Sequence, residues 1–412
     1  MRRTIIRLCA SLLAGAIAVS CAETMEKEAM NQGPEQILPV AAPDSVTFTA
    51  HLEQDTRTQL GESYSVCWSE GDLIKVYNAA HPEGIVFELT KGAGSPEGSF
   101  SGPDPGDGPF YAVYPSSMAG TMTVTAIPVT IPSSQAYEVN SFGPGANLGA
   151  GMASQLDGIC FHNLAGVLCL TLTGNASISR IRVISYDDVA LHGKAVIDGW
   201  DQEMPTLAFD PVQETEESIR EITLDCGTGA SLSADGTTFY FALPAGTLAS
   251  GYRIEVYDTD GLAMVKYAKA AADNTISRGN ILLMPGLTYS AGYKAAFLES
   301  DKIGAIQHAA VDGTIAYPCT YVEGRSQYAY LNTTDTRNLR LQDWDDGYAL
   351  RFAITPKTLQ AGKTCSVTIQ SDGLAAVQST TVDKMRVVKI EDGKVWMLDP
   401  ATGNGYILMM ED

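Results

Sequence analysis

The chain has 412 residues, a formal net charge of −21 and 45% hydrophobic residues. The acidic excess and the lack of any basic cluster argue against a nucleic-acid partner. The apolar content excludes a disordered polymer, and the length suffices for two or three domains that each bury a core.

Residues 1–20 have the layout of a secretory signal peptide. Arg2, Arg3 and Arg7 form a basic head, and residues 8–20 are almost wholly apolar or small. This apolar run of 13 residues is too short to span a bilayer. No later stretch approaches membrane-spanning length either.

The signal ends in AVSC, residues 18–21, which resembles the lipobox of bacterial lipoproteins. In those proteins the cysteine receives a diacylglycerol, signal peptidase II cuts before it, and the new amine is usually acylated. The resemblance therefore implies lipidation of Cys21 and a lipid anchor in the cell outer membrane, because several acyl chains hold a protein stably on a bilayer. An ordinary secretory signal with an incidental cysteine is the alternative.

Residues 21–45 mix acids, Pro, Gln and small residues without apolar periodicity, which predicts a flexible tether. Strand and turn patterns then follow almost without interruption. The dipeptide Asp-Gly occurs nine times and favours tight turns, because both residues tolerate positive φ. We expect hairpins at Asp260-Gly261 and Asp392-Gly393, and in residues 166–174 the leucines of GVLCLTLTG should face one side of a strand.

Helical spacing is not sustained anywhere after the signal, so the sequence predicts an all-β protein built from sandwiches. A Pro- and Gly-rich stretch loosens the strand pattern before residue 155, and the pattern restarts near residue 300. We therefore predict an N-terminal domain over 46–155, a second domain over 156–299 and an additional β domain over 300–412.

Six stretches between residues 46 and 287 together resemble fimbrillins, the pilin-like lipoproteins of Bacteroidales. They are, in chain order, VTFTAHLEQDTRTQL, CWSEGDLIKVYN, FHNLAGVLCLTLTG, SISRIRV, FYFALPAGTLASGYRIEVYDTDG and TISRGNILLMPGL. The resemblance implies two transthyretin-like, Greek-key β-sandwich domains in tandem and export to the cell surface. It also implies removal of a leading segment by an arginine-specific protease, and then polymerisation into a fimbrium by β-strand exchange between subunits.

Arg57 is the first arginine after the signal and hence the processing site that the resemblance implies; a solvated turn arginine is the alternative. In the strand before it, Val46, Phe48 and Ala50 alternate with polar residues, so one face can fill a sandwich groove. The closing strand GYILMMED, residues 405–412, is either a donor strand for another subunit or the last strand of its own domain.

Residues 300–412 extend past the two-domain resemblance. An added domain suits a tip or accessory subunit, or a surface lipoprotein that never polymerises. Asp44-Ser45-Val46 resembles the Asp-Ser/Thr-apolar sites at which these bacteria attach O-glycans, which makes Ser45 a candidate glycosylation site.

Of eight cysteines, six lie beyond the signal and Cys21, and none forms a CxxC pair. Buried free thiols and disulfides both remain open for these six. If one pair forms, we expect it to join Cys319 and Cys365, which are alone in the last third of the chain.

Catalytic and metal-site patterns are missing from the sequence. The five histidines form neither HxH nor HExxH, and neither a GxSxG motif nor a P-loop is present. Residues 258–261, DTDG, lack the remaining ligands of a calcium loop and are interpreted as a turn. The sequence therefore predicts neither an enzyme, a metal site nor a cofactor.

The last quarter of the chain is rich in Tyr and Trp, and aromatic faces can stack on sugars as well as pack across strands. Trp344, beside the acidic DWDDG turn, is the candidate for contact with a host or bacterial surface glycan. The leading hypothesis is a structural or adhesive fimbrial subunit. A monomeric glycan-binding surface lipoprotein is the second, and an enzyme is the third.

Overall fold

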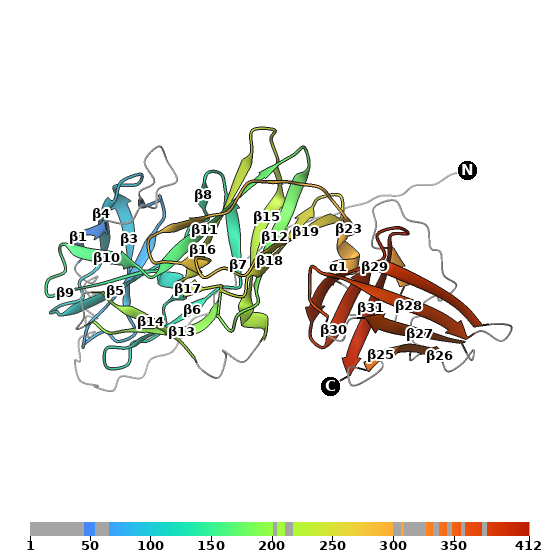
Figure 1. Ribbon diagram of the computed structural model, residues 1–412. Helices are drawn as coiled ribbons and strands as arrows, with labels where there is room; N and C mark the ends of the chain where they lie inside the picture. The colour runs from blue at the N-terminus through green and yellow to red at the C-terminus, as the bar shows by residue number, and fades with distance from the viewer. Residues whose placement is uncertain are drawn as a thin grey trace, which may run out of the picture. The chain divides into compact units, whose positions relative to one another are not determined.

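The computed structural model describes residues 45–53, 66–200, 204–210, 217–299, 306–308, 327–332, 338–343, 348–355, 359–372 and 377–411. Nearly all of its regular structure is β-strand (Figure 1), which confirms the all-β prediction. Within these ranges the helical elements are short: the α-helix α1 (Ala295–Glu299) and the 3-10 turns η1 (Ser116–Met118) and η3 (Glu217–Arg220).

The first sheet closes into a barrel with the strand order β1-β10-β9-β5-β2-β3-β4. Its strands are β1 (Ser45–Leu52), β2 (Leu73–Tyr77), β3 (Ile85–Lys91), β4 (Glu97–Pro103), β5 (Phe110–Tyr114), β9 (Gly149–Ala153) and β10 (Ile159–Asn163). The interior holds an aromatic-rich apolar cluster, to which β1 contributes Phe48, Ala50 and Leu52. A three-stranded sheet in the order β14 (Thr206–Phe209), β13 (Gly193–Asp198), β6 (Ile127–Ile131) shares a second cluster with barrel residues such as Val113 and Ala150.

Two further sheets enclose the largest apolar cluster. One has the order β23 (Tyr293–Lys294), β19 (Leu262–Ala268), β18 (Tyr252–Asp258), β12 (Ser177–Ser185), β15 (Glu221–Ser231), β7 (Ser134–Glu138), β8 (Ser141–Phe142). In the other, β11 (Ala165–Thr173) pairs with β16 (Thr237–Pro244), β21 (Ile281–Leu283) and β22 (Leu287–Thr288). The strands β17 (Gly246–Thr247) and β20 (Thr275–Ile276) pair with each other.

The C-terminal sheet has the order β24 (Ile306–His308), β31 (Asn404–Glu411), β25 (Gln327–Asn332), β26 (Asn338–Asp343), β27 (Tyr348–Thr355), β28 (Thr364–Asp372), β29 (Val377–Glu391), β30 (Lys394–Leu398). Because β30 also pairs with β31, the hydrogen-bonded path returns on itself. The closing strand β31 is therefore paired on both sides within this sheet. The residues Val388, Trp396, Leu398 and Ile407 of this sheet share an apolar cluster with β18, β19 and α1.

Local turn chemistry explains the hairpins that the sequence predicts. β18 and β19 turn at Asp260-Gly261, and β29 and β30 turn at Asp392-Gly393, with φ of +78° at Gly261, +48° at Asp392 and +67° at Gly393. The alternation in GVLCLTLTG also appears as predicted, because Leu168, Leu170 and Leu172 are fully buried in the largest cluster.

The predicted boundary at residue 155 falls between β9 and β10, which pair with each other inside the barrel. Conversely, β6 and β7 precede that residue but pair with β13 and β15, which follow it. Strands from both sides of residue 155 thus share sheets, because pairing follows spatial neighbours and not chain order. The domain limits stay predictions.

The expected Cys319–Cys365 disulfide is not formed, because Cys365 is a buried free thiol. Burial raises the pKa of Cys365 to about 11, and that of Cys169 likewise to about 11. Cys319 lies outside the described residues. The thiols of Cys169 and Cys365 instead behave as small apolar groups inside their sheets, the other reading that the sequence left open. In the part of the chain that the structure covers, no helix has the length and apolarity needed to cross a membrane.

Candidate strand-exchange site

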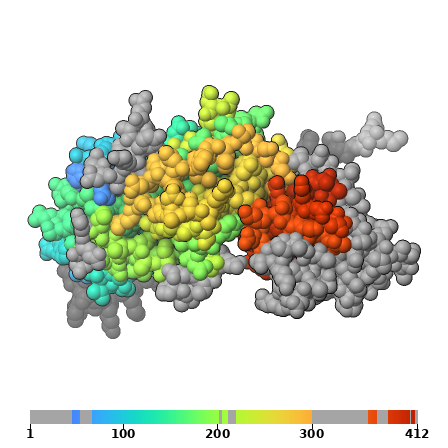
Figure 2. Space-filling model, viewed as in Figure 1, coloured from blue at the N-terminus to red at the C-terminus, as the bar shows by residue number. Residues whose placement is uncertain are grey.

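The first strand of the barrel, β1, is built on the alternation that its sequence predicts. Val46, Phe48, Ala50 and Leu52 turn towards the barrel interior, and the exposed fractions of the last three are 4%, 0% and 6%. The β-branched Thr47 and Thr49 occupy the other face, which suits a half-buried strand. On the face shown in Figure 2, the blue residues of this segment reach the surface only in a small patch.

Aromatic rings surround the buried face of β1. The Phe48 ring lies 5.1 Å from Phe87 in an edge-on arrangement and 6.3 Å from Phe100 in a stacked one. Behind them, Trp68 lies 4.9 Å from Phe100 and 5.5 Å from Phe161. Such pairs add to the free energy of burial, so Phe48 is the main apolar anchor of the strand.

Both edges of β1 are paired. Ser45 to His51 run antiparallel to Pro103 to Glu97 of β4, and Ala50 to Leu52 run parallel to Ile159 to Phe161 of β10. If β1 left, it would expose two rows of backbone donors and acceptors and open the apolar cluster between them. The barrel therefore contains a groove of one strand's width between β4 and β10, which β1 fills.

The C-terminal end of β1 is tied to both neighbours. The Leu52 amide donates to the Pro96 carbonyl at 2.8 Å, and the Glu53 amide donates to the Phe161 carbonyl at 2.9 Å. The Glu53 carboxylate also lies 3.4 Å from Nδ1 of His162, which is within ion-pair distance. Four residues beyond Glu53 comes the predicted processing site, Arg57, which lies outside the described residues.

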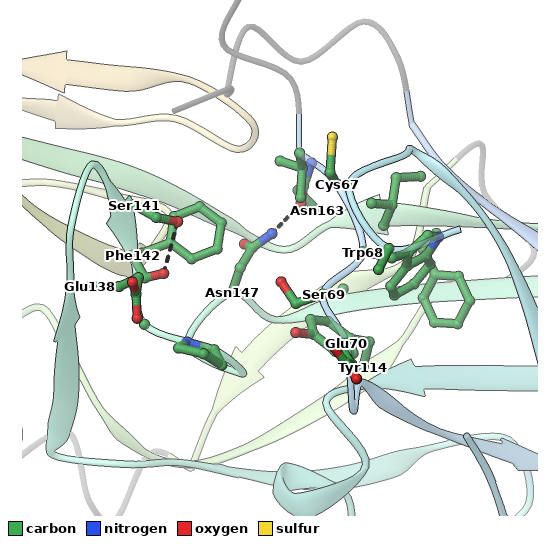
Figure 3. A pocket seen from close by; sticks show the side chains of 18 of the residues that line it. Cys67, Trp68, Ser69, Glu70, Tyr114, Glu138, Ser141, Phe142, Asn147 and Asn163 are labelled. Atoms are coloured by element: carbon green, nitrogen blue, oxygen red, sulfur yellow. Dashed lines mark hydrogen bonds between the residues drawn. The ribbon is translucent and has the colours of Figure 1, made fainter. Parts of the chain in front are cut away.

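A cavity of about 570 Å³ adjoins this end of β1 (Figure 3). Its lining combines aromatic rings with amides and carboxylates: Leu52, Trp68, Tyr114, Phe142 and Phe161 with Asn147, Asn163, Glu70 and Glu138 among others. Asn147 Nδ2 donates to Asn163 Oδ1 at 2.6 Å across the cavity wall, as Figure 3 shows.

A buried carboxylate, Asp72, joins two residues that line the cavity. Asp72 accepts hydrogen bonds from the Ser69 amide at 2.7 Å and from the Tyr114 hydroxyl at 2.8 Å. Burial raises the pKa of Asp72, although these two bonds act in the opposite direction; burial also raises the pKa of Tyr114. Aromatic rings, amides and carboxylates thus face one space, a combination typical of small-molecule pockets.

The predicted site residues are not brought together in the described part of the chain. Ser45 is the first residue of β1; it is exposed, and its hydroxyl donates to the Gly102 carbonyl at 3.3 Å. Glycosylation there stays a prediction. Cys21 and Trp344, like Arg57, lie outside the described residues, and their roles stay predictions too. Within the described ranges, no group of His, Cys, Asp or Glu side chains could hold a metal ion.

Two aromatic residues of the C-terminal sheet are buried. Trp396 is 3% exposed and its indole donates to the Phe297 carbonyl at 3.0 Å, and Tyr406 is 2% exposed. Packing, the alternative to sugar contact, therefore describes these two side chains.

One functional candidate escaped the sequence analysis. Asp157 belongs to an Asp-Gly pair that predicts only a turn, yet its carboxylate accepts the Thr49 amide of β1 at 2.8 Å. The two residues are 108 positions apart, and no local pattern signals such a contact.

Comparisons with known proteins find distant structural neighbours. No protein-family model matches the chain, and no curated protein matches it significantly. A proposed cell adhesion protein from Bacteroides ovatus shares 13% identity at a TM-score of 0.37, over 60% of this chain and 93% of that one. One from Bacteroides uniformis shares 15% identity at a TM-score of 0.34, again over 60% of this chain and 93% of that one.

A fimbrial protein from Bacteroides ovatus shares 8% identity at a TM-score of 0.24, over 70% of this chain and 58% of that one. These neighbours are of the kind that the fimbrillin resemblance implies. At TM-scores below 0.5, these neighbours do not establish a function for this chain.

Proposed function

We propose that the chain is a structural or adhesive subunit of a cell-surface fimbrium, assembled by proteolysis-triggered β-strand exchange. The observation that carries the proposal is the position of β1, an interior strand that is both the first strand of the described residues and directly followed by the predicted processing segment. A strand at this place can be withdrawn without unthreading any other strand.

The physical reason for a proteolytic trigger is competition. While β1 is covalently attached, it fills its groove at an effective concentration of the order of millimolar, and an incoming strand must displace it. Cleavage after Arg57 removes that advantage. A strand from another subunit can then complete the sheet through main-chain hydrogen bonds and fill the apolar groove with alternate side chains.

The same cut would free the subunit from its membrane anchor. In this proposal Cys21 carries the lipid in the outer membrane, and Cys21 and β1 remain on the same fragment after cleavage at Arg57. Mass spectrometry of membrane-extracted protein should find an acylated Cys21; an unmodified terminus elsewhere would contradict this part of the proposal. Residues 300–412 suit a tip or accessory position.

The experiment compares two substitutions at the processing site. Arg57→Ala and Arg57→Lys should both hold the protein on the membrane as a monomer in the native host, because an arginine-specific protease cuts neither. Trypsin added to extracted protein should then restore polymers of the Arg57→Lys variant, since trypsin cuts after lysine, but not of Arg57→Ala. The readout is the ladder of polymers on gels without heating.

Normal incorporation of both variants into filaments would overturn the proposed processing site. If no wild-type polymer forms under any cleavage condition, the strand-exchange proposal falls. The monomeric surface lipoprotein that binds glycans through its C-terminal domain would then become the better hypothesis.

A further inference from the structure

The turn between β9 and β10 holds one residue of β1 by both of its backbone groups. Oδ1 of Asp157 accepts the Thr49 amide at 2.8 Å, and the Gly158 amide donates to the Thr49 carbonyl at 2.8 Å. Gly158 has a φ of +84°, which places its amide beside the carboxylate. We name these two residues the register clamp.

The clamp acts where strand pairing is incomplete. Parallel pairing with β10 begins only at Ala50, so Thr49 is the last residue of β1 before that ladder. The Asp157 carboxylate and the Gly158 amide take the place of a neighbouring strand there. Both hydrogen bonds are made to the backbone, so they do not depend on the side chain of the bound residue. The clamp therefore fixes the position along the groove of any strand that presents a free amide at this point.

The wall of the groove formed by β4 adds a demand on side-chain size. Opposite Ala50 lies Gly98, where an added Cβ would come within 2.7 Å of both Trp68 and Leu89. Those two side chains already fill the space at this level, and Ala50 is fully buried against them. A larger side chain at the Ala50 position would overpack this cluster, which cores tolerate poorly.

At the preceding inward-facing position of the strand, the groove requires a large aromatic ring. Phe48 lies opposite Phe100 and against Phe87. Removing this ring would leave a cavity lined by aromatic groups. The positions of Val46 and Leu52, at the two ends, take aliphatic side chains.

We infer that the groove accepts a strand in a single register, set by Asp157 and Gly158, and selects the pattern aliphatic, aromatic, Ala or Gly, aliphatic at alternate positions. This inference rests on the proposed strand exchange and specifies its partner. The pattern occurs once in the whole chain, at residues 46–52. The segment 287–293 comes nearest, but it ends on a tyrosine.

The pattern therefore points to a partner that is a different polypeptide. The closing segment, residues 405–412, offers Tyr406, Leu408 and Met410 on one face, and Ile407 and Met409 on the other. Neither face has a small residue two places after an aromatic one. Apart from β1 itself, no segment of this chain carries the pattern, so the natural donor strand belongs to another protein, and residues 405–412 do not link copies of this chain through this groove.

The test uses the full chain, cut once after β1 by limited trypsin treatment and checked by mass spectrometry. Four fluorescent peptides are offered: residues 45–53, the same peptide with Ala50→Leu, the same peptide N-methylated at Thr49, and residues 405–412. We expect only the first to enter the groove with high affinity. The other three should bind at least about ten-fold more weakly, the size expected for one lost hydrogen bond or one overpacked side chain.

A second protein variant isolates the clamp. In Asp157→Ala, N-methylation of the peptide should cost much less affinity than in the wild type, because the acceptor of the Thr49 amide is gone. An unchanged N-methyl penalty would remove Asp157 from the clamp.

Equal binding of the Ala50→Leu peptide or of residues 405–412 overturns the selectivity but leaves strand exchange intact. Failure of all four peptides, including residues 45–53, overturns strand exchange itself and this inference with it.

Discussion

Two regions of the molecule hold a β-strand against its neighbours by opposite means. In the barrel, β1 is retained by main-chain hydrogen bonds and by apolar side chains that fit a groove. In the second region, β18 is retained against β29 of the C-terminal sheet by buried charges. Arg253 is 1% exposed and Glu255 0% exposed, and both face Lys389 and Glu391.

The charges of this second region form a connected network. Glu255 accepts hydrogen bonds from Arg253 at 2.9 Å and Arg182 at 2.9 Å, and from the Tyr257 hydroxyl at 2.7 Å. Glu391 accepts from Lys389 at 2.8 Å and lies 3.4 Å from Arg253. Each carboxylate is thus compensated by positively charged side chains, and main-chain atoms cannot supply that charge.

The difference bears on which junction can be exchanged. Any strand with suitable spacing can repeat main-chain bonds, so the β1 groove can pass from one strand to another. A buried ionic network needs the same side chains in the same places, and removing one partner leaves an uncompensated charge in the interior. In the proposed assembly the barrel exchanges a strand, whereas the buried charges keep the junction with the C-terminal sheet in place.

The largest effect is expected from Glu255→Ala. Arg253 and Arg182 would lose their shared buried partner, which should lower the free energy of unfolding by about 3–5 kcal/mol. Urea unfolding followed by tryptophan fluorescence measures the change, and hydrogen exchange in β29 locates it. Glu97→Ala, at an exposed carboxylate on β4, is the matched control and should leave stability nearly unchanged. A comparable loss in both variants would show that the network does not hold the junction.

Phe48→Ala should lower the free energy of unfolding somewhat less, by about 3 kcal/mol. The barrel loses the main apolar anchor of β1 but can relax around the cavity that is left. Hydrogen exchange should speed up across β1 and leave β29 unaffected. Thr47→Ala, on the exposed face of the same strand, serves as control and should change stability by less than about 0.5 kcal/mol. If exchange in β29 rises as well, the two regions are not independent.

Acid should destabilise the charged junction of β18 and β29 before the barrel, the reverse of the effect expected from Phe48→Ala. Burial alone would raise the pKa of Glu255, but Arg253, Arg182 and Lys389 outweigh it and hold that pKa below its ordinary value. The pKa of Glu391 is likewise below its ordinary value, because Lys389 and Arg253 outweigh the effect of burial. Carboxylates with a lowered pKa stabilise the fold above their unfolded pKa, about 4.3, and lose that contribution as the pH falls through the folded pKa.

The barrel should not share this loss, because burial raises the pKa of its Asp72, so that protonation there favours the fold. Hydrogen exchange at pH 7 and again below pH 4, corrected for the intrinsic rate, should show protection lost at β18 and β29 before β1. Earlier loss at β1 would contradict the assignment of charge to one junction and apolar packing to the other.

The smallest effect is expected from Asp157→Ala. The Thr49 amide would lose its acceptor, which should weaken the hold on β1 by about 1 kcal/mol. Exchange of the Thr49 amide should rise about five-fold, and cleaved β1 should leave its groove faster by a similar factor. Asp157→Asn keeps an acceptor oxygen and should retain most of the protection; equal loss in both variants would mean that the charge and not the hydrogen bond matters.

Local patterns in the sequence were sufficient for the all-β class, for the hairpins at residues 260–261 and 392–393, and for the inward face of β1. Alternation and the φ preferences of Asp-Gly are properties of a few consecutive residues, so they can be read without knowing what lies opposite. The same reasoning could not find the neighbours of β1. Its groove is formed by β4 and β10, and its register clamp lies 108 residues away, because pairing is decided by the whole fold.

The strand β18 marks the limit most clearly. Its sequence YRIEVYD alternates charged or polar with apolar residues, the pattern of a strand with one face in water. The structure buries both faces, because β29 supplies Lys389 and Glu391, the latter 138 residues beyond Arg253, to compensate the charged side. The sequence by itself determined which residues share a face of a strand. Only the tertiary structure decided whether that face meets water, a groove or a matching set of charges, because burial depends on partners that local spacing does not specify.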